Sequence, residues 1–164
     1  MIGHRGNSGK RRATPLSRSN GPPATIIVDT REQEPYAFDP LLAAAVRRAL
    51  PAGDYSIEGL EERVAVERKT LDDFVSTVIH SRRRFHEELR KLAGYRTACV
   101  VVEAGVLDVL LHRYRGDAHP NAVLGSALSI ILDFRIPVFF CSSRQAACQF
   151  VQAYLLAAHT RWRP

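Results

Sequence analysis

The sequence predicts an α/β protein in which a mixed central sheet is flanked by helices on both faces. Short runs rich in β-branched residues alternate along the chain with longer segments whose apolar residues recur at helical spacing. Two of the strand segments, 53–57 and 63–69, are joined by a polar turn and predict an antiparallel hairpin, so the sheet is not wholly parallel. The length of 164 residues and the apolar fraction of 46% suit one globular domain with a core of its own.

The first 23 residues differ in composition from the rest of the chain. They are rich in Gly, Ser, Arg and Pro, and they predict a disordered basic N-terminal tail ahead of a folded domain at 24–164. The tail holds five basic residues and no acid, whereas the rest of the chain holds 18 basic and 17 acidic residues. The net charge of +6 therefore belongs mainly to the tail, which is compatible with either an electrostatic arm for DNA or a solubilising segment.

The sequence shows no sign of secretion or of membrane insertion. The apolar runs fall short of the roughly 20 residues that cross a bilayer, and the N-terminus lacks the apolar segment of a secretory signal. The three cysteines lack metal-ligand spacing, and Cys99 and Cys141 lie in apolar runs that predict burial. We therefore expect a reduced intracellular protein with no membrane partner, in the nucleoid or cytoplasm of a microbe or in the nucleus of a eukaryote.

The folded region begins with a strand whose end is charged. Residues 24–28 are mostly β-branched, and Asp29 and Arg31 follow almost directly, as expected where a buried strand opens into a site. The next segment, Leu41 to Leu50, predicts a short amphipathic helix.

The strand expected at 64–69 carries ionisable side chains at its end. Because side chains alternate across a strand, Glu67 and Lys69 point to one face and Arg68 to the other. In the predicted hairpin the start of one strand lies beside the end of its partner, so we expect Asp54 next to Glu67 and Lys69. A carboxylate and an ammonium at the end of a buried strand indicate either a structural ion pair or a site for a metal or a substrate.

Helices and strands alternate along the rest of the chain. Thr70 predicts the N-cap of a helix with Asp73 in its first turn, and a second helix is expected from Arg82 to Tyr95. An apolar strand is expected to end at Glu103. The remaining elements are expected as helix, helix, strand and helix at Val106–His112, Ala122–Phe134, Ile136–Cys141 and Gln145–Ala158.

The last two of these helices, 122–134 and 145–158, are apolar on more than one face. A stripe that wide indicates either a helix wholly buried in its own core or a helix that also contacts a second subunit. We expect a homodimer formed through these C-terminal helices.

Several acids lie at the ends of strands that can be neighbours, namely Asp29, Asp54, Glu67 and Glu103. Clustered carboxylates repel one another unless a cation lies among them, and oxygen ligands with no His or Cys nearby suit Mg²⁺ or Mn²⁺. These four acids are the candidate metal ligands. Such an ion would hold a phosphodiester oxygen and lower the pKa of a bound water, and Lys69 could orient that water or stabilise developing negative charge.

Basic side chains supply candidate contacts to DNA phosphates. The candidates are Arg31, Arg68, Arg82, Arg83 and Arg84. The last three begin a helix, where the dipole disfavours positive charge, so they indicate either a phosphate partner or an ordinary solvated face. Asp73 is expected either to hold Lys69 or Arg68 in place or to be a simple first-turn acid.

Three pieces of the sequence resemble the signature motifs of the XPF family of structure-specific endonucleases. They are Val28-Asp29-Thr30-Arg31-Glu32, Gly53-Asp54-Tyr55 and Val66-Glu67-Arg68-Lys69 with Asp73 four places further on. In that family the pieces read VDxRE, GDY and VERKxxxD in the same order. The resemblance covers about residues 24–158.

The resemblance implies a restriction-endonuclease-like core and an Mg²⁺- or Mn²⁺-dependent endodeoxyribonuclease. Members hydrolyse phosphodiester bonds in flap, fork or branched DNA, in DNA repair or recombination, and dimerise through the nuclease domain. Carried over by matching position, Asp29, Asp54 and Glu67 would hold the metal, and the catalytic residues would be Asp29, Asp54, Glu67, Lys69 and Asp73. Each of these positions is intact, which favours an active enzyme over the alternative, a non-catalytic DNA-binding or scaffold subunit of the same fold.

Members of this family usually carry helix-hairpin-helix modules after the nuclease domain, and some carry a helicase before it. The 164 residues resemble neither, which is compatible with an excised domain or with a compact stand-alone member.

Overall fold

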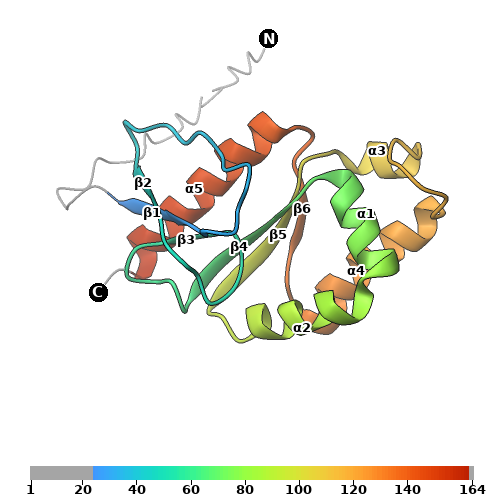
Figure 1. Ribbon diagram of the computed structural model, residues 1–164, viewed down its shortest axis with the longest axis horizontal. Coiled ribbons are helices and arrows are strands. Elements are labelled where there is room, and N and C mark those ends of the chain that lie inside the picture. The colour runs from blue at the N-terminus through green and yellow to red at the C-terminus, as the bar shows by residue number, and fades with distance from the viewer. Residues whose placement is uncertain (1–23, 163–164) are drawn as a thin grey trace, which may run out of the picture.

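A computed structural model describes residues 24–162, so the predicted basic tail at 1–23 lies outside the described residues. Within 24–162, six strands form one mixed sheet in the order β2-β1-β3-β4-β5-β6 (Figure 1). The strands are β1 (Thr25–Val28), β2 (Ala44–Arg47), β3 (Tyr55–Ile57), β4 (Val64–Lys69), β5 (Thr97–Val102) and β6 (Val138–Phe140). The helices are α1 (Leu71–His80), α2 (Arg82–Ala93), α3 (Val106–Leu110), α4 (Pro120–Phe134) and α5 (Arg144–Trp162). The predicted α/β class and mixed sheet are confirmed.

The strand pairing brings the functional segments to one edge of the sheet. Strand β3 runs antiparallel to β1 and to β4, with Tyr55 opposite both Val28 and Val66, which confirms the predicted hairpin. Strands β4, β5 and β6 are parallel to one another. The ends of β1, β4 and β5 and the start of β3 therefore meet at the same edge.

Helices cover both faces of the sheet, as predicted. Helices α1, α2 and α4 enclose one core, in which Phe74, Leu89 and Val100 are buried. Helix α5 covers the opposite face, where Val101 and Leu155 are buried in a second core. Figure 1 shows α5 and the group of α1, α2 and α4 on opposite sides of the strands. No helix within residues 24–162 is long and apolar enough to cross a membrane.

The helix predicted at 41–50 is wrong, because this segment forms the edge strand β2. Ala44 lies opposite Thr25 in a parallel pair with β1. The N–H of Ala44 donates to the carbonyl of Ala24, and that of Arg48 donates to the carbonyl of Val28. Ala, Leu and Arg favour helices, but helix propensity amounts to only a few tenths of a kcal/mol per residue, and pairing with the unpaired backbone groups of β1 outweighs it. The other predicted helices and strands are confirmed, with ends that shift by a few residues.

Candidate active site

The last residues of β4 place their charges on two different faces of the sheet. The ammonium of Lys69 lies 5.6 Å from the ring centroid of Phe85, on the face covered by α1 and α2. Arg68 points to the α5 face, where its guanidinium binds Glu103. The alternation predicted from the sequence is confirmed.

On the α1 and α2 face, Glu67 and Lys69 form a close ion pair. Lys69 Nζ lies 2.8 Å from Glu67 Oε1, and the two side chains are only 21% and 12% exposed. Burial alone would lower the pKa of Lys69, but the adjacent carboxylate of Glu67 outweighs it, and the pKa is raised. Lys69 is therefore a protonated amine at neutral pH, and the structural ion pair considered above is present.

Asp54 enters this site from the start of β3. Its Oδ2 accepts a hydrogen bond of 2.7 Å from the backbone N–H of Arg68. Burial, and next the charge of Glu67, raise the pKa of Asp54 to about 7. Lys69 acts on the same carboxyl group in the opposite direction, so the expected closeness of these three side chains is confirmed. A cation between Asp54 and Glu67 would relieve their repulsion.

Gly53 allows this close approach. Its φ of +76° is unfavourable for a residue with a side chain, and a Cβ there would lie 3.0 Å from the carbonyl oxygen of Val66. The glycine of the Gly53-Asp54-Tyr55 motif therefore lets the chain pass directly against β4 and place Asp54 beside its end.

Asp29 is held in a separate set of hydrogen bonds. Its Oδ1 accepts from the backbone N–H and from Nε of Arg31, at 2.8 and 2.6 Å, and its Oδ2 accepts from the N–H of Leu50 at 2.6 Å. The side chain is 1% exposed, and burial acts to raise its pKa, but the hydrogen bonds from Arg31 and Leu50 outweigh burial and lower it. Both oxygens are thus occupied by the protein itself.

The predicted three-acid cluster is therefore only partly assembled. Among residues 24–162, no three side chains of Asp, Glu, His or Cys converge as ligands for a metal ion. The charge of Glu67 acts directly on Asp54, whereas the carboxylate of Asp29 is engaged by Arg31 and by the N–H of Leu50. The donor set that fits a hard cation is a pair of carboxylates.

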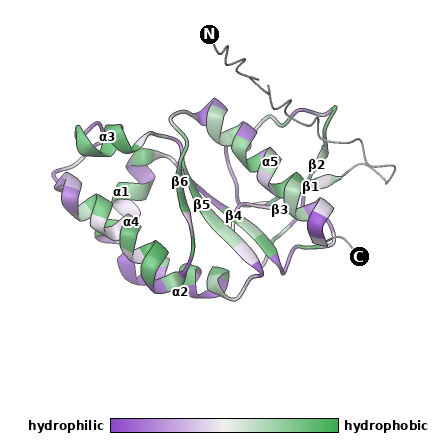
Figure 2. Cartoon of the chain, turned by 180° about the vertical axis from the view of Figure 1, so that it is seen from behind, coloured by the Kyte–Doolittle hydropathy of each residue, from purple (hydrophilic) through white to green (hydrophobic). Residues whose placement is uncertain are grey.

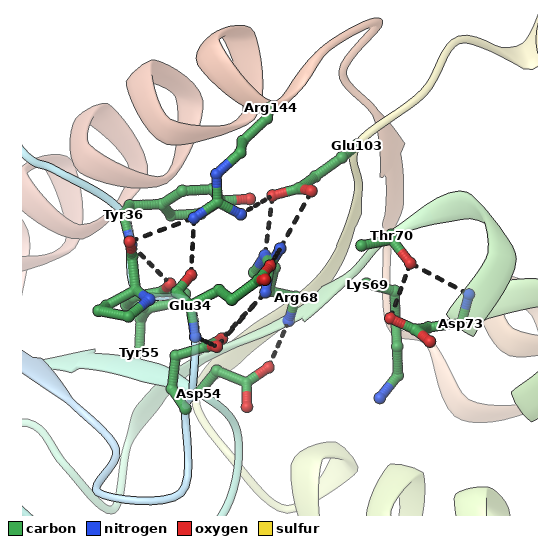
Figure 3. A network of polar contacts seen from close by, with 12 residues as sticks. Glu34, Tyr36, Asp54, Tyr55, Arg68, Lys69, Thr70, Asp73, Glu103 and Arg144 are labelled. Atoms are coloured by element: carbon green, nitrogen blue, oxygen red, sulfur yellow. Dashed lines mark hydrogen bonds and ion pairs between the residues drawn. The ribbon is translucent and has the colours of Figure 1, made fainter.

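Glu103, the fourth acid considered, is neutralised on the α5 face (Figure 3). Arg68 donates to both of its oxygens, at 2.8 and 3.1 Å, and Arg144 donates to one of them at 3.0 Å. Burial would raise the pKa of Glu103, but Arg68 and Arg144 lower it. The Arg68 side chain is only 9% exposed and also pairs with Glu32, so its guanidinium is committed to the protein and is badly placed for a DNA phosphate.

Asp73 lies in the first turn of α1 and binds the N-cap residue Thr70, as predicted if it is a simple first-turn acid. Thr70 Oγ1 donates to its carboxylate at 2.7 Å and accepts from its backbone N–H at 3.1 Å. The carboxylate is thus bound to Thr70, and it acts on Lys69 only through its charge.

Several of these groups, among them Asp54, Lys69 and Asp73, line a polar cleft of about 450 Å³ at the edge where β1, β3 and β4 meet. Its lining residues are Arg31, Glu32, Gln33, Glu34, Asp54, Arg68, Lys69, Thr70, Asp73 and Thr77. The sequence analysis assigned no function to Gln33, Glu34 or Thr77. Thr77 was detectable in principle, because it lies one helical turn after Asp73.

Arg31 lines the cleft, and three further arginines precede a residue that contacts Lys69. The side chain of Arg31 is 71% exposed although its Nε is fixed by Asp29. Arg82, Arg83 and Arg84 are exposed at the start of α2. The next residue, Phe85, lies beneath the ammonium of Lys69, so this basic turn begins next to the site.

The chain is an α/β protein with a mixed six-stranded sheet, at one edge of which Lys69 lies beside the carboxylates of Asp54 and Glu67. It belongs to the ERCC4 domain family, whose model matches residues 28–154. The expected membership of the XPF group of nucleases is confirmed.

Solved structures support the same assignment. XPF from Aeropyrum pernix matches with a TM-score of 0.63 and 24% identity, over 85% of this chain and 66% of that one. The same protein in complex with DNA matches with a TM-score of 0.63 and 25% identity, over 84% of this chain and 65% of that one.

A longer relative comes from Methanocaldococcus jannaschii. This protein, provisionally named an ATP-dependent RNA helicase, is 36% identical over 123 residues. The match covers 75% of this chain but only 14% of that protein, and this chain spans just under two thirds of the matched XPF chains.

Proposed function

We propose that this chain is a metal-dependent, structure-specific DNA endonuclease that hydrolyses phosphodiester bonds in flap, fork or branched DNA, in repair or recombination. Its family and the structural likeness to an XPF protein in complex with DNA support the proposal. The observation that carries it is the grouping of three charged side chains: Asp54 and Lys69 line one polar cleft, and Glu67 pairs with Lys69 and acts electrostatically on Asp54. Partly buried charges cost free energy unless they bind an oppositely charged group, such as a metal ion or a substrate phosphate.

In this proposal, Asp54 and Glu67 hold the divalent cation, Mg²⁺ or Mn²⁺. When bound, the ion supplies Lewis acidity and lowers the pKa of a bound water. Glu67 also holds Lys69 in place, and the protonated amine of Lys69 donates to a phosphate oxygen as negative charge develops on it. Asp29 fixes Arg31 at the mouth of the cleft, so we assign Asp29 an indirect contribution to phosphate binding.

The DNA backbone is proposed to pass the mouth of the cleft. Arg31 contacts one phosphate beside the scissile bond, and the arginines at the start of α2 contact the flanking duplex. Arg68 is left out of these contacts because it is buried against Glu103.

The test is cleavage of labelled 3′-flap, fork, duplex and single-stranded DNA with Mg²⁺, with Mn²⁺ and with EDTA. We expect cutting of the branched substrates that requires the metal and is lost in Glu67→Gln. The matched control is Glu87→Gln, because Glu87 is an exposed glutamate on α2 with only a 3.9 Å ion pair to Arg83. Cutting that persists in Glu67→Gln, or that ignores EDTA, contradicts the proposal.

One observation favours the alternative, a non-catalytic DNA-binding or scaffold subunit. Asp29 and Glu67 are already paired with Arg31 and Lys69, as in a purely structural site. Tight metal-independent binding of branched DNA without any cutting would establish this alternative.

We also propose a homodimer, with its interface at α3 and α4. Exposed large apolar side chains gather on and directly after α3 and on α4, and among residues 24–162 none of them lies on α5, which buries its apolar side in its own core. They are Val106, Leu107, Leu110, Leu111, Leu128, Ile131 and Leu132. Figure 2 shows α3 and α4 side by side, with hydrophobic residues along both. Light scattering should find a dimer that Leu132→Glu dissociates and that Leu41→Glu, an exposed leucine beside β2, leaves intact. A monomeric wild-type protein refutes the interface.

A further inference from the structure

The loop at residues 30–36 forms one wall of the cleft through Gln33 and Glu34. Its backbone carbonyls are held by arginines from distant parts of the chain. Arg47 of β2 donates to the carbonyls of Thr30 and Glu32, at 3.1 and 2.6 Å. Two further carbonyls of the loop, those of Glu34 and Pro35, are held by a residue of α5.

Arg144, the first residue of α5, supplies these two bonds. Its Nη2 donates to the carbonyls of Glu34 and Pro35, at 2.7 and 3.2 Å, while its Nη1 donates to Glu103 at 3.0 Å (Figure 3). Its guanidinium also lies 5.1 Å from the ring centroid of Tyr36. One side chain therefore ties the loop, the end of β5 and the start of α5 together.

These contacts require the planar fork of a guanidinium. Arginine has five N–H donors in fixed directions and can bind two carbonyls and a carboxylate while it stacks on a ring. An ammonium is a point charge that could still face Glu103 but has no such geometry. Carbonyls of an exposed loop would otherwise bind water and leave the loop free to move.

We infer that Arg144 is a positioning residue for substrate binding, which it serves by holding the loop at 30–36 as a rigid wall. The inference rests on the proposed function, because it assigns the wall to the DNA-binding cleft. Arg31 lies in the same loop, so a loose wall misplaces the group that faces the phosphate. Asp54, Glu67 and Lys69 lie at β3 and β4, and the wall does not carry them.

The experiment compares Arg144→Ala, Arg144→Lys and the control Arg161→Ala, which changes an exposed arginine on the same helix. Hydrogen exchange of the peptide covering residues 31–36 measures the wall without any need for activity. We expect exchange to accelerate about tenfold in both Arg144 variants, because two charge-assisted hydrogen bonds are lost. On flap DNA we expect KM to rise about fivefold with kcat within about twofold, as for lost substrate binding.

Arg144→Lys separates positioning from charge compensation. Lysine keeps a positive charge opposite Glu103, so a role in stability alone predicts that Lys restores both exchange and KM, and that result overturns the inference. Unchanged exchange in Arg144→Ala overturns it too, as does faster exchange with unchanged KM. If the wild-type protein cuts no DNA, the proposed function fails, and the dissociation constant for the same DNA then takes the place of KM in testing Arg144.

Discussion

Arg68 and Lys69 are consecutive residues of one strand and both line the cleft, yet their side chains have different partners on opposite faces of the sheet. On the α5 face, Arg68 is enclosed by Glu103, Glu32 and the ring of Tyr36. On the other face, Lys69 shares a cleft with two carboxylates, one of which has a pKa raised to about 7.

Some charged side chains stabilise the fold through contacts within the protein, whereas others are not neutralised by the protein and favour binding of an ion or a substrate. The guanidinium of Arg68 is fully used by the protein, and it joins the loop after β1 to the end of β5. Burial and the negative charge of Glu67 both destabilise the ionised form of Asp54. A network that is complete stabilises structure, and one that is incomplete favours an added cation.

Arg68→Met should give the largest loss of stability. It leaves Glu103 and Glu32 buried with fewer partners, and breaking such a pair costs about 3 to 5 kcal/mol of unfolding free energy. Urea denaturation measures this cost. The control, Arg63→Met, changes an exposed arginine just before β4 and should cost less than about 1 kcal/mol. Equal costs would show that the α5-face network contributes nothing.

Lys69→Met should show the opposite profile. We expect kcat on flap DNA to fall by about 10² to 10³, because a donor to the developing charge is lost. The free energy of unfolding should fall less than in Arg68→Met, because only Glu67 loses a partner and the cost of burying the amine is removed as well. A variant that keeps its activity but loses stability would make Lys69 a structural residue.

Asp54 should make the metal-free protein less stable as the pH rises. Its folded-state pKa of about 7 is above the ordinary value of about 3.9, so the folded state binds the proton more tightly and stability falls between these pH values. In Asp54→Asn this component of the urea-unfolding pH profile should vanish. Mg²⁺ at pH 8 should stabilise the wild type but not the variant, and identical profiles would refute the assignment.

The arginines at the start of α2 should give the smallest effects. Arg84→Ala should reduce the slope of log Kd for DNA against log salt by about 1, because one phosphate contact is lost. Arg90→Ala, at the opposite end of the same helix, is the control and should leave the slope unchanged. Fluorescence anisotropy with duplex DNA at several salt concentrations measures both, and equal slopes would leave the triplet as a solvated face.

Local sequence patterns predicted most elements but not β2. Residues 41–50 favour a helix locally, and only the unpaired edge of β1 makes 44–47 a strand. The hairpin that joins Asp54 to Glu67 was predictable, because its polar turn and alternating strands are encoded within 15 residues. The pairing of Asp29 with Arg31 was harder to predict, since the sequence gives both residues but not the direction of either side chain.

The sequence by itself determined the family, the mixed sheet and the placement of Asp54, Glu67 and Lys69 together, because motif order and strand alternation are local properties. Only the tertiary structure decided which charged side chains are neutralised within the protein and which are not. Glu103 binds Arg68 and Arg144 across 35 and 41 positions of sequence, and no local pattern encodes such contacts. Burial determines the free-energy cost of an unpaired charge, because only a buried charge must be paired by the protein itself or by a ligand.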